Sequence, residues 1–349
     1  MTPTIYRSLR DLCASGQTAA LGIITSVKGS SPQKRGAKAL FFADGRIVGT
    51  MGGGCLEAEI QERARRALLT GRPDPFDLVL DHDFGWDDGL ICGGRVSGVI
   101  LPNARAGAAL WEALARRDAT RTWGITADYE LAWVETLVAQ EPEGEAESAH
   151  WLYRETVTPP CALWIAGAGH IAQAVAPLAV SVDFEVTIFD DRASLASRSC
   201  FTEPVRLCSG SWEEIFAEPF PAGRPTFGLI VTRGHRHDAL VLRNWIHRDF
   251  AFLGMIGSSR KSRTIREHFL AEGIAGEEAL NAVSSPVGLD IGAVSVPEIA
   301  VSIMGQFIQK RAAYVAETNS LTTVRGAVSS RNRGSFAAAA VALGDNAGR

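Results

Sequence analysis

The sequence has 349 residues, 46% of them hydrophobic and 21% charged, and its 35 basic and 39 acidic side chains leave a net charge of −4. This length favours two domains, and the near-balanced charge gives no reason to expect a nucleic acid or a membrane as partner. Met1 to Gly16 lacks the pattern of a secretory leader, and no apolar run approaches the ~18 residues that a membrane span needs, so we expect a cytoplasmic protein.

Residues 1–105 are expected to form an N-terminal mixed α/β domain. Strand-like runs alternate there with glycine turns, and Asp44-Gly45 is placed to turn a hairpin within residues 38–50. Residues 106–158 are rich in Ala, Glu and Arg and end in an acidic stretch. We expect them to form a helical and linker segment.

Residues 159–318 repeat the order strand, turn and helix. The strand-like runs are ALWIA, FEVTIFDD, TFGLIVTRG and AFLGMIGSS, each followed by a helical period. Strands that alternate with helices predict right-handed βαβ units and a doubly wound parallel sheet, so we expect a Rossmann-like domain. Near its end, Ser295 and Glu298 have the spacing of a capping box before an amphipathic helix. Residues 319–349 are expected to be a flexible tail.

Six cysteines stand at positions 13, 55, 92, 161, 200 and 208, and no two form a CxxC pair. This spacing argues against a disulfide framework or a closed zinc site. Four of them lie in strand- or loop-like sequence, where a buried cysteine acts as a small hydrophobic residue. Cys55 and Cys92 differ, because both lie beside consecutive glycines.

Cys55 follows Gly52, Gly53 and Gly54 and precedes a segment with helical periodicity. The helix start would stabilise a thiolate, and three residues without side chains leave room for a bulky ligand.

Cys92 is followed by Gly93 and Gly94, where side chains would otherwise crowd a ligand. Two soft thiolates on open backbone suit a metal centre held by Cys55 and Cys92, or sulfur transfer through a persulfide. The alternative is a pair of buried cysteines beside glycine turns.

A dinucleotide fingerprint stands at the start of the second domain. Gly167, Gly169 and Ala172 follow an apolar strand and open a helix, and Asp190 ends the next strand, where an acid would hold a ribose hydroxyl. Arg192 could shift the preference towards a 2′-phosphate. The alternative is a sheet that keeps the glycines for packing and binds no nucleotide.

Three further loops combine turn residues with polar side chains. Residues 29–38 suit either a phosphate-bearing ligand or a solvated hairpin loop. In residues 232–238, His235 and His237 could ligate a metal, contact a ligand or move protons, while Asp238 could cap the following helix. In residues 256–261, the hydroxyl and cationic groups suit an anion or a solvated first helical turn. The candidate anion-binding residues of that last loop are Ser258, Arg260 and Lys261.

With these residues assembled, the chain resembles the XdhC/CoxI family of molybdenum-hydroxylase maturation factors. The resemblance is carried by GSSPQKRGAKALFFADGRIVGTMGGGCLEAEI, GLICGGRV, LWIAGAGHIAQAVAPLA, VTIFDDR, FLGMIGSSRKSRT and SPVGLDIGAVSVPEIAVSI. The segments GGGCLE, CGG and GLDIGA make it specific.

The resemblance implies a chaperone rather than a free-standing enzyme. Such proteins bind the molybdenum cofactor (Moco), work with a cysteine desulfurase while a sulfido ligand is installed, and pass the product to a xanthine dehydrogenase-type apo-enzyme. It makes Cys55 and Cys92 the residues expected to hold the cofactor or its sulfur, and we expect a homodimer. Two alternatives remain: an NAD(P)-dependent oxidoreductase with His235 or His237 as proton donor, and a redox sensor in which Cys55 and Cys92 form a disulfide.

Overall fold

The computed structural model describes residues 4–80, 94–134 and 151–314. These residues divide into two compact units, with the boundary between Pro160 and Cys161. In this described part of the chain, no helix combines the length and the apolar character required to cross a membrane.

The first unit is built on an antiparallel five-stranded sheet with the order β3-β2-β1-β5-β4. Its strands are β1 (Ala19–Lys28), β2 (Lys38–Phe42), β3 (Ile47–Gly49), β4 (Asp74–Leu80) and β5 (Gly94–Leu101). The hairpin expected within residues 38–50 is confirmed, because β2 pairs with β3 on either side of Asp44 and Gly45.

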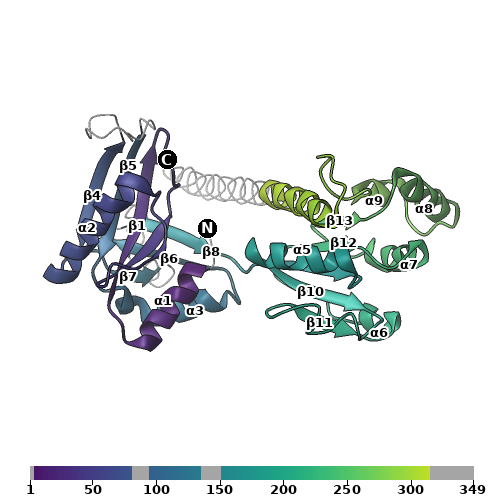
Figure 1. Cartoon of the computed structure of the whole chain (residues 1–349), viewed down its shortest axis with the longest axis horizontal. Coiled ribbons are helices and arrows are strands. Elements are labelled where there is room, and N and C mark those ends of the chain that lie inside the picture. The colour runs from purple at the N-terminus through teal and green to yellow at the C-terminus, as the bar shows by residue number, and fades with distance from the viewer. Residues whose placement is uncertain (1–3, 81–93, 135–150, 315–349) are drawn as a thin grey trace, which may run out of the picture. The chain divides into compact units, whose positions relative to one another are not determined.

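Helices cover both faces of this sheet (Figure 1). They are α1 (Thr4–Ser15), α2 (Gly54–Thr70) and α3 (Ala108–Arg116), with the short 3-10 turn η2 (Ala104–Gly107) before α3. Helix α2 packs Leu56 and Ile60 against one face, and α1 packs Leu9 against the other. Side chains alternate across a strand, so Leu21 and Ile24 of β1 join opposite clusters.

The range 106–158, predicted as a helical and linker segment, contains more than helix. Besides α3 it holds a three-stranded antiparallel sheet with the order β7-β6-β8. Its strands are β6 (Arg121–Thr126), β7 (Leu131–Trp133) and β8 (Trp151–Val157). Trp111, Trp123 and Tyr153 bury their rings in the same cluster as α1, so this segment completes the core of the first unit.

A buried ion pair fastens β8 to the five-stranded sheet. The Lys38 side chain at the start of β2 is fully buried and pairs with Glu155 of β8. Glu155 also accepts hydrogen bonds from the hydroxyls of Tyr6 (2.6 Å) and Tyr153 (3.1 Å). Burial lowers the pKa of Lys38 and Glu155 opposes that shift, while burial raises the pKa of Tyr6 well above its usual value. The network therefore depends on one compensated charge pair.

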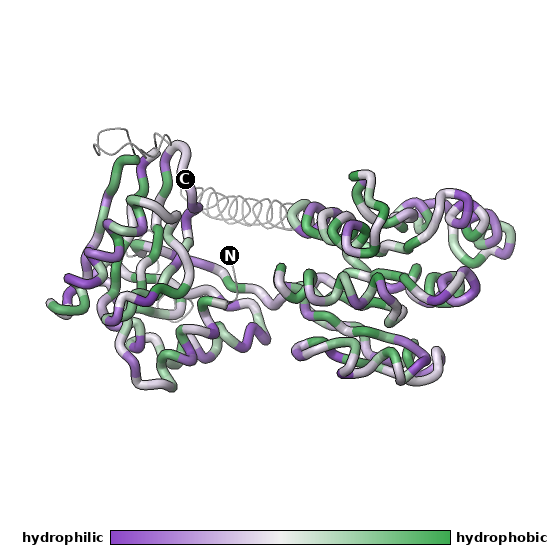
Figure 2. Tube along the Cα trace, viewed as in Figure 1, coloured by the Kyte–Doolittle hydropathy of each residue, from purple (hydrophilic) through white to green (hydrophobic). Residues whose placement is uncertain are grey.

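The second unit has the strand order β11-β10-β9-β12-β13-β14, and all its strand pairs are parallel. Numbered from β9, this is the 3-2-1-4-5-6 order of a Rossmann fold, which confirms the expected fold class. The strands are β9 (Cys161–Ala166), β10 (Phe184–Asp190), β11 (Arg206–Ser209), β12 (Thr226–Ile230), β13 (Phe252–Met255) and β14 (Val283–Ser284). Their central members are largely hydrophobic along their length (Figure 2), as expected for strands buried on both faces.

Helices flank this parallel sheet on both faces. They are α5 (His170–Ser181), α6 (Trp212–Phe216), α7 (His235–Trp245), α8 (Ser259–Ala271), α9 (Glu277–Ala282) and a helix over residues 296–314. The capping box expected before that last helix is present. Glu298 accepts hydrogen bonds from the backbone N–H groups of Val294 and Ser295, and its own N–H donates to the Ser295 hydroxyl.

We expect Lys38→Met to lower the free energy of unfolding of the first unit by about 3 kcal/mol, because it leaves Glu155 charged beside two buried tyrosines. The double variant Lys38→Met/Glu155→Gln should cost less than the single one, because no charge is left uncompensated. Hydrogen exchange of the β1 and β2 amides at increasing urea concentration measures the stability of the first unit in both variants. Equal destabilisation by the two variants would show that the pair does not act as a unit.

Candidate functional site

The turn before α2 presents Cys55 on bare backbone. Gly52, Gly53 and Gly54 have φ values of 130°, 74° and 56°, a region that side-chain-bearing residues rarely adopt. Helix α2 begins at Gly54, and the Cys55 side chain is exposed. A Cβ at Gly53 or Gly54 would meet no atom within 4 Å. The expected position of Cys55 at a helix start is confirmed, and open space surrounds the glycines next to it.

Glu57 holds this turn in place. Its carboxylate accepts hydrogen bonds from the Thr50 hydroxyl (2.9 Å) and from the backbone N–H groups of Met51 (3.1 Å) and Gly53 (3.3 Å). A residue one turn inside the helix therefore satisfies donors that a strand-to-helix turn leaves without partners. The acidic side chain fixes the glycine turn that carries Cys55.

The loop after β1 borders both the Cys55 turn and the start of β5. A Cβ at Gly52 would lie 3.3 Å from the Pro32 side chain, and a Cβ at Gly94 would overlap the backbone carbonyl of Ser30. Gly94 therefore makes room for the chain's own backbone. Cys92 and Gly93 lie outside the described residues, two positions and one position before Gly94.

Two of the three cationic side chains in the 29–38 loop are engaged within the first unit, and the third, Lys34, is exposed. Lys38 is buried against Glu155. Arg35 donates to the carbonyl oxygens of Thr25 (3.0 Å) and Arg154 (3.3 Å) and lies over the Tyr153 ring. These two residues hold the loop in the fold, so they do not offer free charges to a phosphate.

The fingerprint loop has the geometry of a Rossmann turn. Gly167 has φ 111°, and a Cβ there would overlap the Val231 carbonyl after β12. Gly169 is the N-cap of α5, with no atom near its Cβ position, and Ala172 is fully buried against the sheet. The glycines thus allow close packing at Gly167 and leave the helix start open at Gly169.

Both carboxylate oxygens of Asp190 accept hydrogen bonds from its own loop, so neither is left open for a ribose hydroxyl. Its carboxylate accepts hydrogen bonds from the backbone N–H of Ala168 (2.7 Å) and from the backbone and guanidinium of Arg192 (2.8–2.9 Å). Burial alone would raise the pKa of Asp190, but the hydrogen bonds from Arg192 and Ala168 lower it below the usual value. The guanidinium of Arg192, which was considered for a 2′-phosphate, forms an ion pair with Asp190.

The loop after β12 carries a chain of polar contacts. Arg233 forms a bidentate ion pair with Asp191 (2.8 and 2.9 Å) and lies 2.8 Å from the His237 ring nitrogen. His235 is exposed at the first position of α7. Asp238, considered as a helix cap, lies inside α7 instead, because Gly234 is the N-cap.

Asp238 is fully buried and joins this loop to α8. It accepts hydrogen bonds from the Thr232 backbone N–H (3.0 Å) and hydroxyl (2.7 Å), and it pairs with Lys261. Lys261 also donates to the Ile256 carbonyl (3.1 Å), so its charge is used within the unit. Ser258 caps α8 by accepting from the Lys261 backbone N–H. Of the three residues expected to bind an anion here, Arg260 is left exposed with no partner among the described residues.

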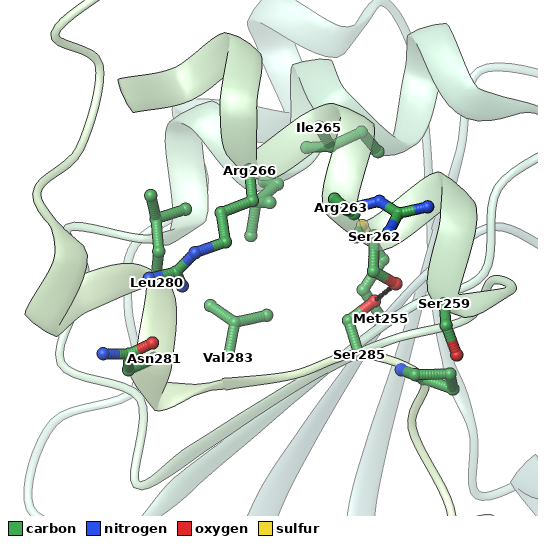
Figure 3. A pocket seen from close by; sticks show the side chains of 12 residues that line it. Met255, Ser259, Ser262, Arg263, Ile265, Arg266, Leu280, Asn281, Val283 and Ser285 are labelled. Atoms are coloured by element: carbon green, nitrogen blue, oxygen red, sulfur yellow. Dashed lines mark hydrogen bonds between the residues drawn. The ribbon is translucent and has the colours of Figure 1, made fainter. Parts of the chain in front are cut away.

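A cavity of about 360 Å³ opens one turn further along α8 (Figure 3). Its polar lining includes Ser262, Arg263 and Arg266 of α8 with Asn281 and Ser285 across from them. The sequence analysis missed these residues. The available signal was the spacing of Ser259, Ser262, Arg263 and Arg266, which places four polar side chains on one helix face.

No group of three or more His, Cys, Asp or Glu side chains in residues 4–80, 94–134 and 151–314 could hold a metal ion. This finding does not test the predicted metal site at Cys55 and Cys92, because Cys92 lies outside the described residues. The described geometry therefore defines an α/β protein with an exposed thiol on a glycine turn in one unit and a Rossmann fold in the other.

Comparisons with known proteins agree with this class. The family model of the XdhC Rossmann domain matches residues 163–307, and that of the XdhC and CoxI family matches residues 12–81. The chain belongs to the XdhC/CoxI family.

Two relatives match over most of their length. The chain is 24% identical over 329 residues to a Bacillus subtilis protein named as a probable xanthine dehydrogenase subunit, covering 88% of this chain and 97% of that protein. It is 25% identical over 312 residues to the molybdenum cofactor insertion chaperone PaoD of Escherichia coli, covering 88% of each. A solved structure described as a xanthine dehydrogenase from Bacillus halodurans shares the fold, with a TM-score of 0.73 at 23% identity over 90% of this chain and 96% of that one.

We expect Asp190→Asn to destabilise the second unit by about 2 kcal/mol at neutral pH, because it removes the charge-assisted bonds that fix the fingerprint loop. The folded-state pKa of Asp190 is lowered, so its stabilisation is present above the unfolded value of about 3.9 and is lost as the pH falls through the folded value. The cost of the variant should therefore shrink below about pH 4.

Hydrogen exchange of the β9 and β10 amides in the full chain measures this local stability. Asp191→Asn is the matched control, because it removes a more exposed ion pair and should cost about 1 kcal/mol or less. Equal effects of the two variants would contradict the assignment of Asp190 as the residue that fixes the loop.

Proposed function

We propose that this protein is a Moco-binding chaperone that supports sulfuration of the cofactor and its insertion into a xanthine dehydrogenase-type molybdenum hydroxylase. The observation that carries the proposal is the exposed Cys55 at the start of α2, beside two glycines with open space around them. Family membership and the likeness to an insertion chaperone support it.

The residues present suit this cargo. A thiolate is a soft ligand that matches molybdenum or its sulfur, and it is also the nucleophile needed to carry a persulfide. The uncrowded backbone at Gly53 and Gly54 lets a flat ring system approach the thiol. Glu57 keeps the turn fixed in the absence of cargo, which reduces the ordering cost of binding.

Cys92 is proposed as the second thiol of this site. It stands two residues before Gly94, whose backbone packs on Ser30, and the same loop packs on Gly52 through Pro32. Each cysteine therefore stands a few positions along the chain from a glycine, Gly52 or Gly94, that contacts the loop after β1. In this proposal Cys55 and Cys92 hold the cofactor or its sulfur together.

The partners follow from that role. A cysteine desulfurase would supply the sulfur, and the apo-enzyme of a molybdenum hydroxylase would receive the loaded cofactor in the cytoplasm. The protein would act as a homodimer. A carrier of this kind needs moderate affinity, because cargo that is bound too tightly cannot be released to the client.

Cys55→Ser and Cys92→Ser are each expected to reduce Moco retention at least about tenfold, because a serine hydroxyl is a hard, weakly acidic ligand. The measurement is form-A pterin fluorescence per mole of protein purified anaerobically. Cys200→Ser is the control, because that thiol lies in a loop of the second unit, and it should retain the cofactor like the wild type. Wild-type retention in both test variants would contradict the thiol assignment.

A nicotinamide dinucleotide at the Rossmann domain is the second candidate. The strand order and the open N-terminus of α5 at Gly169 favour it. The carboxylate of Asp190 weighs against it, because Ala168 and Arg192 occupy both oxygens that a ribose would need. With His235 or His237 as proton donor, this would be an oxidoreductase.

Titration calorimetry with NADH and NADPH separates the two candidates. We expect no saturable binding tighter than about 1 mM, because a ribose must displace Arg192 from Asp190. Tighter binding that Gly169→Arg abolishes would establish a nucleotide site and favour the second candidate.

A further inference from the structure

The cavity beside α8 is lined by five elements of the second unit. Its floor is apolar and consists of Leu242 from α7, Met255 from β13, Ile265 from α8, Leu280 from α9 and Val283 from β14. This floor lies under the outer half of the parallel sheet, on the β13 and β14 side. The cavity is therefore separate from the fingerprint loop between β9 and α5.

Two arginines at this cavity carry uncompensated charge. Neither Arg263 nor Arg266 has a hydrogen-bond or ion-pair partner in the described part of the chain, and no acidic residue lines the cavity. Three other cations of the same unit are paired: Arg192 with Asp190, Arg233 with Asp191 and Lys261 with Asp238. Because Arg266 is only partly exposed, its charge acts with less solvent screening than that of a free surface side chain.

The polar groups stand on two sides of the central space. Figure 3 shows Arg266 extending from α8 towards Leu280 and Asn281, with the Ser262 and Ser285 hydroxyls on the other side and Val283 below. The two hydroxyls lie 2.6 Å apart, and the Ser262 hydroxyl also donates to the Ser258 carbonyl oxygen at 3.2 Å. The Arg266 guanidinium and the Asn281 amide are the N–H donors that this space offers to a phosphate.

The size and floor of the cavity define the rest of the ligand. About 360 Å³ is within the range of small-molecule sites and accommodates one phosphorylated ring system, but not a dinucleotide. An apolar floor of branched side chains and one methionine favours a flat ring face over a sugar alone. Inorganic phosphate would leave this floor uncovered.

We propose that this cavity binds a phosphomonoester of a planar heterocycle, with Arg266 holding the phosphate, Arg263 adding positive charge on the opposite side, and the apolar floor contacting the ring. A nucleoside 5′-monophosphate and a phosphorylated pterin share this chemistry. The proposal is independent of the thiol site in the first unit, and Cys55→Ser leaves it unchanged.

Titration calorimetry of the full chain with adenosine 5′-monophosphate tests the site. We expect saturable binding that Arg266→Gln weakens at least about tenfold and Arg263→Gln weakens by a smaller factor, because Arg263 is more exposed. Arg260→Gln is the matched control on the same helix, since Arg260 is exposed, has no partner among the described residues and does not line the cavity. It should change affinity less than about twofold.

Four further ligands test the recognition of the phosphate and of the ring separately. Adenosine and inorganic phosphate should each bind at least about tenfold more weakly than the monophosphate, because each lacks one half of the recognised group. The phosphorylated pterin form A and its dephosphorylated product should differ in the same direction. Tighter binding of form A than of the nucleotide would identify the pterin as the source, and the reverse would identify the nucleotide.

The proposal is overturned by any of three results. These are the absence of saturable binding by both phosphorylated ligands, equal affinity for a ligand and its dephosphorylated product, and equal loss in Arg260→Gln and Arg266→Gln. Thermal unfolding of each variant checks the fold, and Arg266→Lys, which keeps the charge but not the planar fork, should give an intermediate affinity.

Discussion

Carboxylates from within the chain satisfy the backbone donors at the turns that lead from strand to helix. Glu57 accepts from the turn before α2, Asp190 from the loop before α5, and Asp238 from the turn before α7. Such turns leave N–H groups without helical partners, and a buried unpaired donor costs about 1–3 kcal/mol. These bonds let glycine-rich turns keep one conformation, and the positions of Cys55 and of the fingerprint glycines depend on them.

The same arrangement decides where positive charge remains available. Arg192 and Lys261 neutralise two of the buried carboxylates, so cations that stand next to the fingerprint and to the α8 turn in sequence are used by the fold. Arg263 and Arg266, one helical turn further along, face a cavity without an acidic residue. The four basic residues at the start of α8 thus divide into one structural cation, Lys261, two that line the cavity, and the exposed Arg260.

The two units supply different chemistry to the proposed role. The first unit presents a soft, exposed thiol on a turn that is already ordered, which suits a cargo rich in sulfur and metal. The second unit has a Rossmann sheet in which the Asp190 carboxylate is already hydrogen-bonded within its own loop. It also has a separate cationic cavity with an apolar floor. This combination favours the proposed carrier role over that of a nicotinamide-dependent dehydrogenase.

The sequence alone determined the features that depend on neighbours along the chain. The Asp44-Gly45 hairpin, the helix that starts beside Cys55, the alternating strands and helices of the parallel sheet and the Ser295–Glu298 capping box follow from periodicity and turn chemistry. Only the tertiary structure decided which charged side chains form ion pairs within the protein. Lys38 pairs with Glu155 across 117 positions, Lys261 pairs with Asp238 across 23, and the strands of residues 121–157 join the first core through such contacts. The local sequence around a charged residue is the same whether its partner is a distant side chain, water or a ligand. The partner is therefore determined by tertiary packing.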